Sequence, residues 1–336
     1  MKRYVRVLVG VLFVLAFASQ SMAAKVSSLP YSYFWLSIKP DAVTTVATPG
    51  IVLMGGGTDV DAAFQWMCAR SGGGDFLVIR ATGTDAYNPY IKQLCPNVKS
   101  VATLIIPTQA AANDDRVINY ILQAKAIWIA GGDQSNYINY WKDTKVQAAL
   151  NTQIGNGVPI GGTSAGLNVL SQFIYSAQAS KGVTSSQALA NPYNRYMSFD
   201  RDFTTVPILE GVIGDPHFFE RDRMGRDLAF MCRIYQSGWS AAPRAISVDE
   251  QTALQIDSSG QGTVAGSGSV YFMKAPGAPE LCALNKPLTY RDISVYRIEI
   301  GGKFDLKAWG GTGGNGYTVS AESGAMTSTQ SNGSLY

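Results

Sequence analysis

The first half of the chain alternates between short hydrophobic runs and longer segments of mixed polarity. The runs are apolar throughout, as in strands buried on both faces, and four of them are Ile51–Met54, Phe76–Ile79, Val101–Ile106 and Ala126–Ile129. Segments with helical character follow or separate them, namely Asp61–Arg70, Asp115–Gln123 and Gln134–Leu150. This alternation predicts an α/β fold with a mostly parallel sheet and helices on both faces.

Two of these runs are closely followed by glycines. Gly55, Gly56 and Gly57 follow the first run, and Gly131-Gly132 come shortly after the run that ends at Ile129. Ligands of parallel α/β sheets bind at the carboxyl ends of the strands, so we expect the functional site at these turns. A dinucleotide site is a weak alternative, because GGGTD at 55–59 lacks the spacing G-x-G-x-x-G.

The pattern changes near Ala245. Closely spaced strand candidates with glycine turns follow, which is typical of antiparallel hairpins; they are Ala245–Asp249, Thr252–Ile256, Gly262–Ala265, Ser269–Met273 and Ile293–Glu299. Residues 301–336 are rich in Gly, Ser and Thr, which predicts a loosely ordered C-terminal extension. We therefore expect a single α/β domain over residues 24–300, followed by this extension.

The N-terminus has the layout of a secretory signal peptide. Three basic residues within the first six positions precede an apolar run, Val7–Phe17, and Ser21 and Ala23 supply the small side chains that a signal peptidase reads. The run is shorter than the roughly 20 residues that a membrane span needs. We therefore predict that residues 1–23 are removed and that the mature protein is exported, periplasmic or secreted, without a membrane anchor.

Removal of this segment also removes the net charge. The full chain has 27 Lys and Arg against 24 Asp and Glu, and residues 1–23 hold three of the bases and none of the acids. The mature chain is then balanced, which argues against a nucleic-acid partner bound through phosphate neutralisation.

The chain has four cysteines, Cys68, Cys95, Cys232 and Cys282, and an exported protein meets an oxidising compartment. Four cysteines allow three connectivities. We favour Cys68–Cys95 with Cys232–Cys282, because each closes a shorter loop. No pair has CxxC spacing and the chain has one histidine, so we expect no metal site and no cofactor.

Residues 162–166, GTSAG, match the G-x-S-x-G pattern of a nucleophile elbow. A short strand candidate, Val158–Gly161, precedes the pattern and a helix-like run from Leu167 follows it. Such a turn lifts a serine hydroxyl out of the backbone, and small neighbours let the chain pass closely. We therefore take Ser164 as the candidate nucleophile, the alternative being an ordinary glycine-rich turn.

A catalytic serine needs a base, which is usually histidine. His217 is the only histidine in the chain, so a Ser-His pair must use it. The alternative is a hydrogen-bonded histidine of the core, but residues 215–226, DPHFFERDRMGR, concentrate charge unlike a core segment.

The sequence resembles the cyanophycinases, within the wider peptidase E group of serine peptidases. The matching blocks appear in family order: GGDQ at 131–134, GTSAG at 162–166, NPYNR at 191–195, DPHFFERDRMGR at 215–226 and VDEQTAL at 248–254. The resemblance implies a flavodoxin-like fold related to class I glutamine amidotransferases. It also implies a Ser-His-Glu triad with Glu250 as the acid, and exopeptidase cleavage of cyanophycin into β-Asp-Arg dipeptides. Cyanophycin is a poly-aspartate with arginine on each side-chain carboxyl group.

The resemblance also implies substrate-binding residues: Gln134, Asp215, Arg221, Arg223 and Arg226. One position departs from the family, because Pro216 stands where a glutamine usually precedes the histidine, and this puts the substrate preference in question.

The arginines have a meaning of their own, since guanidinium groups bind carboxylates in a bidentate manner. Three of them follow the candidate base, which predicts a carboxylate receptor. The alternative is a solvated helix face whose charges neutralise one another.

The residues alone leave the acid of the triad open. Asp200, Asp202 and Glu210 lie between Ser164 and His217, which would give the chain order of α/β-hydrolases. Glu250 follows a strand candidate instead, and we choose it mainly on the resemblance, with Asp249 as a structural carboxylate.

For the oxyanion hole we expect the N–H of Ala165, directly after the nucleophile, and that of Gly132. The expected function is an exported serine exopeptidase acting on cyanophycin, with a polypeptide or dipeptide as its partner. An exported isoaspartyl or aspartyl dipeptidase and a non-catalytic aspartyl-peptide-binding protein are the alternatives. A homodimer is compatible with the sequence.

Overall fold

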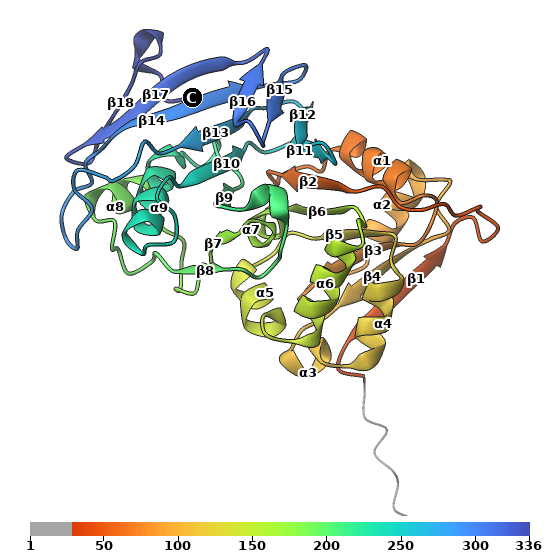
Figure 1. Ribbon diagram of the computed structural model, residues 1–336. Helices are drawn as coiled ribbons and strands as arrows, with labels where there is room; N and C mark the ends of the chain where they lie inside the picture. Colours follow the sequence, from red (N-terminus) through yellow and green to blue (C-terminus); the bar gives the residue numbers. More distant parts are fainter. Residues whose placement is uncertain (1–28) are drawn as a thin grey trace, which may run out of the picture.

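The structure is a computed structural model that describes residues 29–336. In this range the chain forms two β-sheets with helices packed against them (Figure 1). The expected signal peptide, residues 1–23, lies outside the described residues. Within the described part of the chain, no helix has the length and apolar character needed to cross a membrane.

The first sheet has ten strands. In spatial order they are β1 (Ser32–Ser37), β4 (Ser100–Ile105), β3 (Phe76–Arg80), β5 (Ala126–Ile129), β6 (Ile160–Thr163), β2 (Gly50–Met54), β11 (Thr252–Asp257), β12 (Gln261–Gly266), β15 (Lys303–Asp305) and β16 (Gly310–Thr312). The centre, from β4 to β2, is parallel, and the strands added on either side are antiparallel. The predicted α/β fold with a parallel sheet is therefore confirmed.

The strand order brings the glycine-rich turns together. Strands β4, β3, β5 and β6 follow the 2-1-3-4 neighbour order of flavodoxin-like folds, and β2 occupies the next position although it precedes them in sequence. Since β2 pairs in parallel with β6 from Ile51↔Ile160 to Met54↔Thr163, the turn after β2 lies beside the turn after β6. The turn after β5 flanks β6 on its other side.

Helices cover both faces of the parallel strands. Alternate residues of a strand point to opposite faces. Thus Leu77 and Ile79 of β3 pack with α3 (Gln109–Ala112), α4 (Asp115–Gln123), α5 (Gln134–Trp141) and α6 (Lys145–Gly155). Phe76 and Val78 pack with α1 (Asp61–Arg70) and α2 (Tyr87–Leu94) on the other face.

The second sheet lies at the upper left in Figure 1. In spatial order its strands are β18 (Ala325–Ser328), β17 (Asn315–Glu322), β14 (Tyr290–Ile298), β13 (Val270–Lys274), β10 (Arg244–Val248), β9 (Val212–Asp215), β7 (Phe173–Tyr175) and β8 (Phe199–Arg201). The sheet shares a hydrophobic core with α8 (Ser185–Ala190) and α9 (Met224–Gln236). Short helices α7 (Ala165–Leu170), η1 (Pro207–Leu209) and η2 (Ser331–Gly333) complete the elements.

Two expectations from the sequence differ from the structure. The predicted helix Gln134–Leu150 is broken into α5 and α6 around Asp143, whose φ of 58° lies outside the helical region. The segment 301–336 is not loosely ordered, because β15 to β18 extend both sheets. Its Gly, Ser and Thr residues form short strands whose partners lie elsewhere in the chain, which composition does not reveal.

The expected disulfide pairing is the one in the structure. Cys68–Cys95 ties α1 to the end of α2, with Cα atoms 5.9 Å apart. Cys232–Cys282 ties α9 to the segment before β14, with Cα atoms 6.2 Å apart. Loops of this length lower the entropy of the unfolded chain enough to stabilise the fold by about 4 kcal/mol each.

Candidate active site

Ser164 lies at the turn between β6 and α7. Its backbone has φ 53° and ψ −113°, a conformation that residues other than glycine rarely adopt. Its N–H donates to the carbonyl group of Met54 at 3.0 Å, which attaches the turn to the end of β2. The strained turn therefore holds the serine at the carboxyl ends of the strands, where it lines a cavity.

The glycines on either side of this serine are required by close backbone contacts. A Cβ atom on Gly162 would lie 2.5 Å from the carbonyl carbon of Gly166, and a Cβ on Gly166 would lie 2.0 Å from the carbonyl oxygen of Ile129. No side chain fits at these distances, so both glycines are needed where β5, β6 and α7 pass one another.

His217 comes from the second sheet, two residues beyond β9. Its φ is 49°, and its N–H donates to the carbonyl group of Gly55 at 2.8 Å, in the turn after β2. Its Nε2 lies 2.8 Å from Oγ of Ser164, which is hydrogen-bonding distance. The structure therefore brings the predicted nucleophile and the only histidine together, although 53 residues separate them.

Glu250 lies between β10 and β11, and its Oε1 is 2.5 Å from Nδ1 of His217. This contact favours the tautomer in which Nδ1–H donates to the carboxylate and Nε2 accepts from the serine hydroxyl. The three side chains thus form a continuous hydrogen-bonded chain from carboxylate to hydroxyl.

The other candidate acids lie elsewhere. Asp200 pairs with Lys142, and Asp202 accepts a hydrogen bond from Gln172 at 3.0 Å. Glu210 is exposed. Asp249 is buried and accepts backbone N–H bonds at 2.9 and 3.0 Å, and burial raises its pKa to about 6. It holds the backbone near the site rather than the imidazole.

The turn Gly55–Gly57 leaves room for the base and the acid. A Cβ atom on Gly56, whose φ is 100°, would lie 2.3 Å from Cε1 of His217. A Cβ on Gly57 would lie 2.9 Å from Oε2 of Glu250. The sequence predicted that the functional site lies at these glycines but did not predict that they face His217 and Glu250. Three consecutive glycines after a strand were the available signal, but nothing local shows which side chains they face.

The electrostatics of the site keep His217 neutral. Burial lowers its pKa, the contact with Glu250 raises it, and the charges of Arg221 and Arg223 lower it further, so the pKa lies below the ordinary value of 6.5. A histidine that is neutral near pH 7 can accept a proton from serine.

The expected oxyanion donors both lie beside the nucleophile. Ala165 is the first residue of α7. In the turn after β5, a Cβ atom on Gly131 would lie 3.6 Å from Cβ of Ser164, and Gly132 lines the same cavity. Gln134 also lines it and donates to the carbonyl group of Tyr175 at 3.2 Å.

The cavity has a volume of about 280 Å³ and a cationic wall. Besides Ser164 and His217, its lining includes four basic residues: Lys181, Arg221, Arg223 and Arg226. Sequence reasoning missed Lys181, together with Asn168 and Tyr175 in the same lining. Lys181 lies between β7 and α8 in no recognisable motif, so only the tertiary structure assigns it to the site.

The predicted substrate-binding cluster has two parts. Asp215 is buried and accepts hydrogen bonds from two guanidinium groups. Arg226 donates through Nε to Oδ2 at 2.6 Å and through Nη2 to Oδ1, and Arg223 donates through Nη1 to Oδ1 at 3.1 Å. Burial raises the pKa of Asp215, but the two guanidinium groups outweigh it and hold the pKa below its usual value. Arg226 is therefore used by an internal ion pair. Arg221 is 53% exposed at its side chain and lies 3.8 Å from Glu250, so it can meet a substrate.

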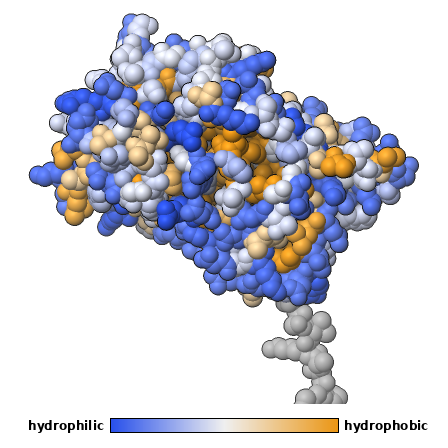
Figure 2. Space-filling view, viewed as in Figure 1, coloured by the Kyte–Doolittle hydropathy of each residue, from blue (hydrophilic) through white to orange (hydrophobic). Residues whose placement is uncertain are grey.

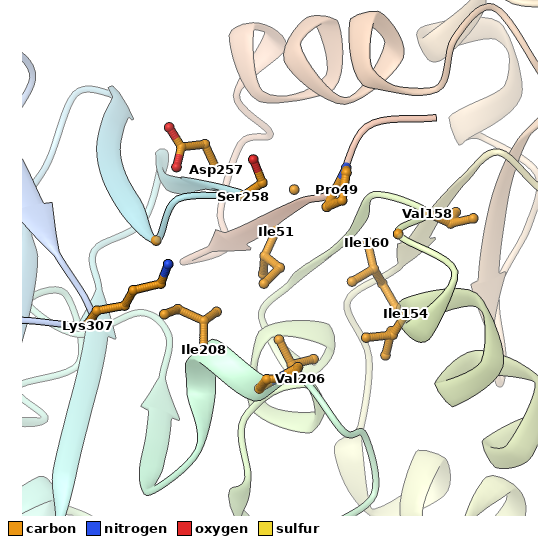
Figure 3. A pocket seen from close by; sticks show the side chains of 14 residues that line it. Pro49, Ile51, Ile154, Val158, Ile160, Val206, Ile208, Asp257, Ser258 and Lys307 are labelled. Atoms are coloured by element: carbon orange, nitrogen blue, oxygen red, sulfur yellow. The ribbon is translucent and has the colours of Figure 1, made fainter. Parts of the chain in front are cut away.

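A larger cavity of about 500 Å³ lies at the opposite ends of the parallel strands. Its aliphatic walls include Ile51, Ile160, Val206 and Ile208, with Asp257 and Lys307 at the rim (Figure 3). Hydrophobic residues gather in a hollow on this face of the molecule (Figure 2). None of the three hydrogen-bonded residues Ser164, His217 and Glu250 lines this cavity, so its larger volume does not make it the candidate active site.

Comparison with known proteins agrees with this geometry. Residues 81–260 match the model of peptidase family S51. The chain is 27% identical over 188 residues to a cyanophycinase of Trichormus variabilis, a match that covers 54% of this chain and 56% of the relative. The chain therefore spans little more than half the length of this relative.

Two longer matches cover most of the chain. A cyanophycinase of Thermosynechococcus vestitus is 24% identical over 295 residues, which covers 81% of this chain and 85% of the relative. The crystal structure of a peptidase from an acI-B1 Actinobacterium superposes with a TM-score of 0.52 at 15% identity and covers 78% of this chain and 98% of that chain. This structural likeness supports the fold.

Proposed function

Because this chain belongs to peptidase family S51, we propose that it is an exported serine exopeptidase that hydrolyses cyanophycin or related aspartyl peptides. The observation that carries the proposal is the chain of contacts from Glu250 to His217 at 2.5 Å and from His217 to Ser164 at 2.8 Å. A serine hydroxyl, a neutral imidazole and a carboxylate in this order are the parts that acyl transfer needs.

In the proposed mechanism, Oγ of Ser164 attacks the scissile carbonyl carbon while Nε2 of His217 takes the hydroxyl proton. Glu250 stabilises the resulting imidazolium, and the N–H groups of Ala165 and Gly132 receive the oxyanion. Collapse of the tetrahedral intermediate breaks the C–N bond, and the leaving amine takes the proton from Nε2. Water then attacks the acyl-enzyme with His217 as base again, and the acid product and the serine hydroxyl are released.

The cationic wall of the cavity supports a substrate with carboxylates. Arg221 and Lys181 lie in this wall. Arg221 is 3.8 Å from the carboxylate of Glu250, which is already bound to His217. A carboxylate beside the scissile bond would form charge-assisted hydrogen bonds with these cations, and the guanidinium group of Arg221 could bind it in a bidentate manner. Two of the relatives are cyanophycinases by name, and aspartyl peptides carry such groups.

The proposal is tested with mature protein and purified cyanophycin, with release of β-Asp-Arg followed by mass spectrometry. Ser164→Ala serves as the control for adventitious peptidases. Release by wild type alone supports the proposal. Hydrolysis of β-aspartyl dipeptides without any action on the polymer would instead support the dipeptidase alternative, which Pro216 keeps open.

A protein that labels with a serine-directed fluorophosphonate at Ser164 is not a passive binding protein. If wild type binds aspartyl peptides but neither labels nor hydrolyses them, the non-catalytic alternative replaces the peptidase. N-terminal sequencing of protein recovered from outside the cytoplasm tests export and the cleavage after Ala23. The mass of this protein in solution by light scattering tests the homodimer.

A further inference from the structure

The loop that carries His217 is bound to the rest of the molecule on two sides. On its inner side, the N–H of His217 donates to Gly55, and that of Phe218 donates to the carbonyl group of Val248 at 3.2 Å. The N–H of Phe219 donates to the carboxylate of Asp249 at 3.0 Å. These contacts join the loop to the turn after β2 and to the end of β10.

On its outer side the loop contacts Tyr336. The Tyr336 hydroxyl accepts the N–H of Met224, at the start of α9, at 3.0 Å and donates to Oδ1 of Asp222 at 2.9 Å. Its ring makes edge-to-face contacts with Phe218 and Phe219, with centroids 5.5 and 5.3 Å apart. One side chain therefore contacts the residue next to the base and also the far end of the loop.

Tyr336 is itself held by the second sheet. Tyr317 of β17 donates its hydroxyl hydrogen to the carbonyl group of Leu335 at 3.0 Å. The side-chain amide of Gln330 donates to the carbonyl groups of Ser334 and Tyr336 at 3.0 and 3.3 Å. The ring of Tyr336 also meets that of buried Tyr271 in β13 at 6.0 Å. These contacts fix the position of Tyr336 against the second sheet.

The loop needs such support because two of its residues have unfavourable backbone conformations. His217 has φ 49° and Asp222 has φ 47°. Residues with side chains hold positive φ values only where their surroundings determine the conformation. The hydroxyl of Ser185, in α8, donates to the carbonyl group of Asp222 and accepts the N–H of Arg226 at 3.1 Å, so it also holds this end of the loop. Tyr336 differs from Ser185 because it contacts Asp222 and Met224 and also the ring of Phe218, directly after His217.

We propose that Tyr336 is a positioning residue for His217, acting through the loop from Pro216 to Arg223. The proposal rests on the proposed function, since it assumes that His217 is the base. Tyr336 does not line the cavity. Its loss should therefore lower kcat and leave substrate affinity nearly unchanged.

The test compares Tyr336→Phe and Tyr336→Ala with Tyr290→Phe. Tyr290 is a matched control, because its buried hydroxyl donates one hydrogen bond, to Gly277 at 2.7 Å, away from the loop. We expect Tyr336→Ala to lower kcat on the order of 100-fold, the effect of misplacing a reacting group by about 1 Å, with KM within about twofold of wild type. Tyr336→Phe keeps the ring and should lower kcat about 10-fold.

The pH dependence separates positioning from a general loss of stability. Burial keeps the pKa of His217 low, so a loosened loop should move the acidic limb of kcat/KM to higher pH. The rate of fluorophosphonate labelling at Ser164, measured against pH, gives the same shift without any substrate. Tyr290→Phe should shift neither profile.

Asp222 provides a second route if Tyr336→Ala does not fold. Asp222→Gly removes the acceptor and tolerates the positive φ, whereas Asp222→Asn keeps an acceptor oxygen. Asp222→Gly should lower kcat about as much as Tyr336→Phe. The double variant that combines these two changes should lower kcat little further, and Asp222→Asn should keep kcat near the wild-type value.

Two results overturn the inference: Tyr336 variants that match Tyr290→Phe in kcat and acidic limb, or fully additive losses in the double variant. In both cases wild type still labels at Ser164, so the proposed function stands. If wild type itself does not label, the proposed function fails and the inference fails with it.

Discussion

The nucleophile and its partners are held in place in different ways. Ser164 occupies a turn whose essential glycines, Gly162 and Gly166, lie within two residues of it in sequence, although Met54 and Ile129 of the neighbouring strands also contact the turn. His217 and Glu250 lie in loops whose contacts are distant in sequence, with Gly55, Gly57 and Tyr336 among them. A local motif therefore builds the nucleophile, and the packing of two sheets builds the base and the acid. Changes far from the motif should damage the second region while leaving the first intact.

The largest effect is expected at the nucleophile itself. Ser164→Ala should lower kcat by roughly 10⁴–10⁶, the range found when a triad serine is lost. Its thermal unfolding should stay near wild type, because only a hydroxyl group is removed. A variant that keeps more than a tenth of the activity would show that another residue attacks the substrate.

Glu250→Gln should follow with a loss of about 10⁴ in kcat, because an amide can hold the imidazole in the wrong tautomer. Asp200→Asn is the matched control, since it removes a competing candidate acid that pairs with Lys142 instead. Steady-state kinetics of the two variants decide between the acids. Equal and small losses would remove Glu250 from the triad.

Gly56→Ala tests the long-range part of the comparison directly. The new methyl group would lie 2.3 Å from Cε1 of His217 at a φ of 100°, so we expect kcat to fall by about 10² or more. Gly155→Ala, in α6, is the control, since its Cβ would meet nothing within 4 Å. Kinetics together with thermal unfolding check the pair. Normal activity of Gly56→Ala would mean that the loop carrying His217 adjusts easily.

The arginines should divide into one that binds substrate and one that stabilises the fold. Arg226→Gln leaves the buried carboxylate of Asp215 short of its partner and should cost about 3–5 kcal/mol of unfolding free energy. Arg221→Gln should leave stability nearly unchanged and lower kcat/KM about ten- to a hundredfold on substrates with a carboxylate. Substrates with blocked carboxylates serve as controls. Equal losses on both kinds of substrate would mean that Arg221 acts on the shape of the site.

The smallest effect is a shift in pH dependence. Because the pKa of His217 is depressed, chiefly by burial, the acidic limb of kcat/KM should lie below pH 6.5. Activity is then lost as the pH falls through this depressed pKa. Arg221→Gln should move the limb upward, since the charge of Arg221 also lowers this pKa. A limb above pH 6.5 in wild type would contradict the electrostatics of the site.

The sequence alone was sufficient wherever the physical requirement is local. Continuous apolar runs such as Ala126–Ile129 predicted the parallel strands, because a strand buried on both faces must be apolar throughout. GTSAG at 162–166 predicted the elbow, because the steric need for small residues lies within one turn. A single histidine left one candidate base, and loop length favoured the cysteine pairs that the structure contains.

Only the tertiary structure decided what depends on distant partners. It broke the helix predicted over Gln134–Leu150, gave the segment 301–336 its strands and joined Arg226 to buried Asp215. It also placed Lys181 in the active-site cavity and Tyr336 against the loop of the base. Apart from the helix break at Asp143, these outcomes have no local signal, because strand pairing, ion pairing and loop support depend on which segments meet after the sheets have packed.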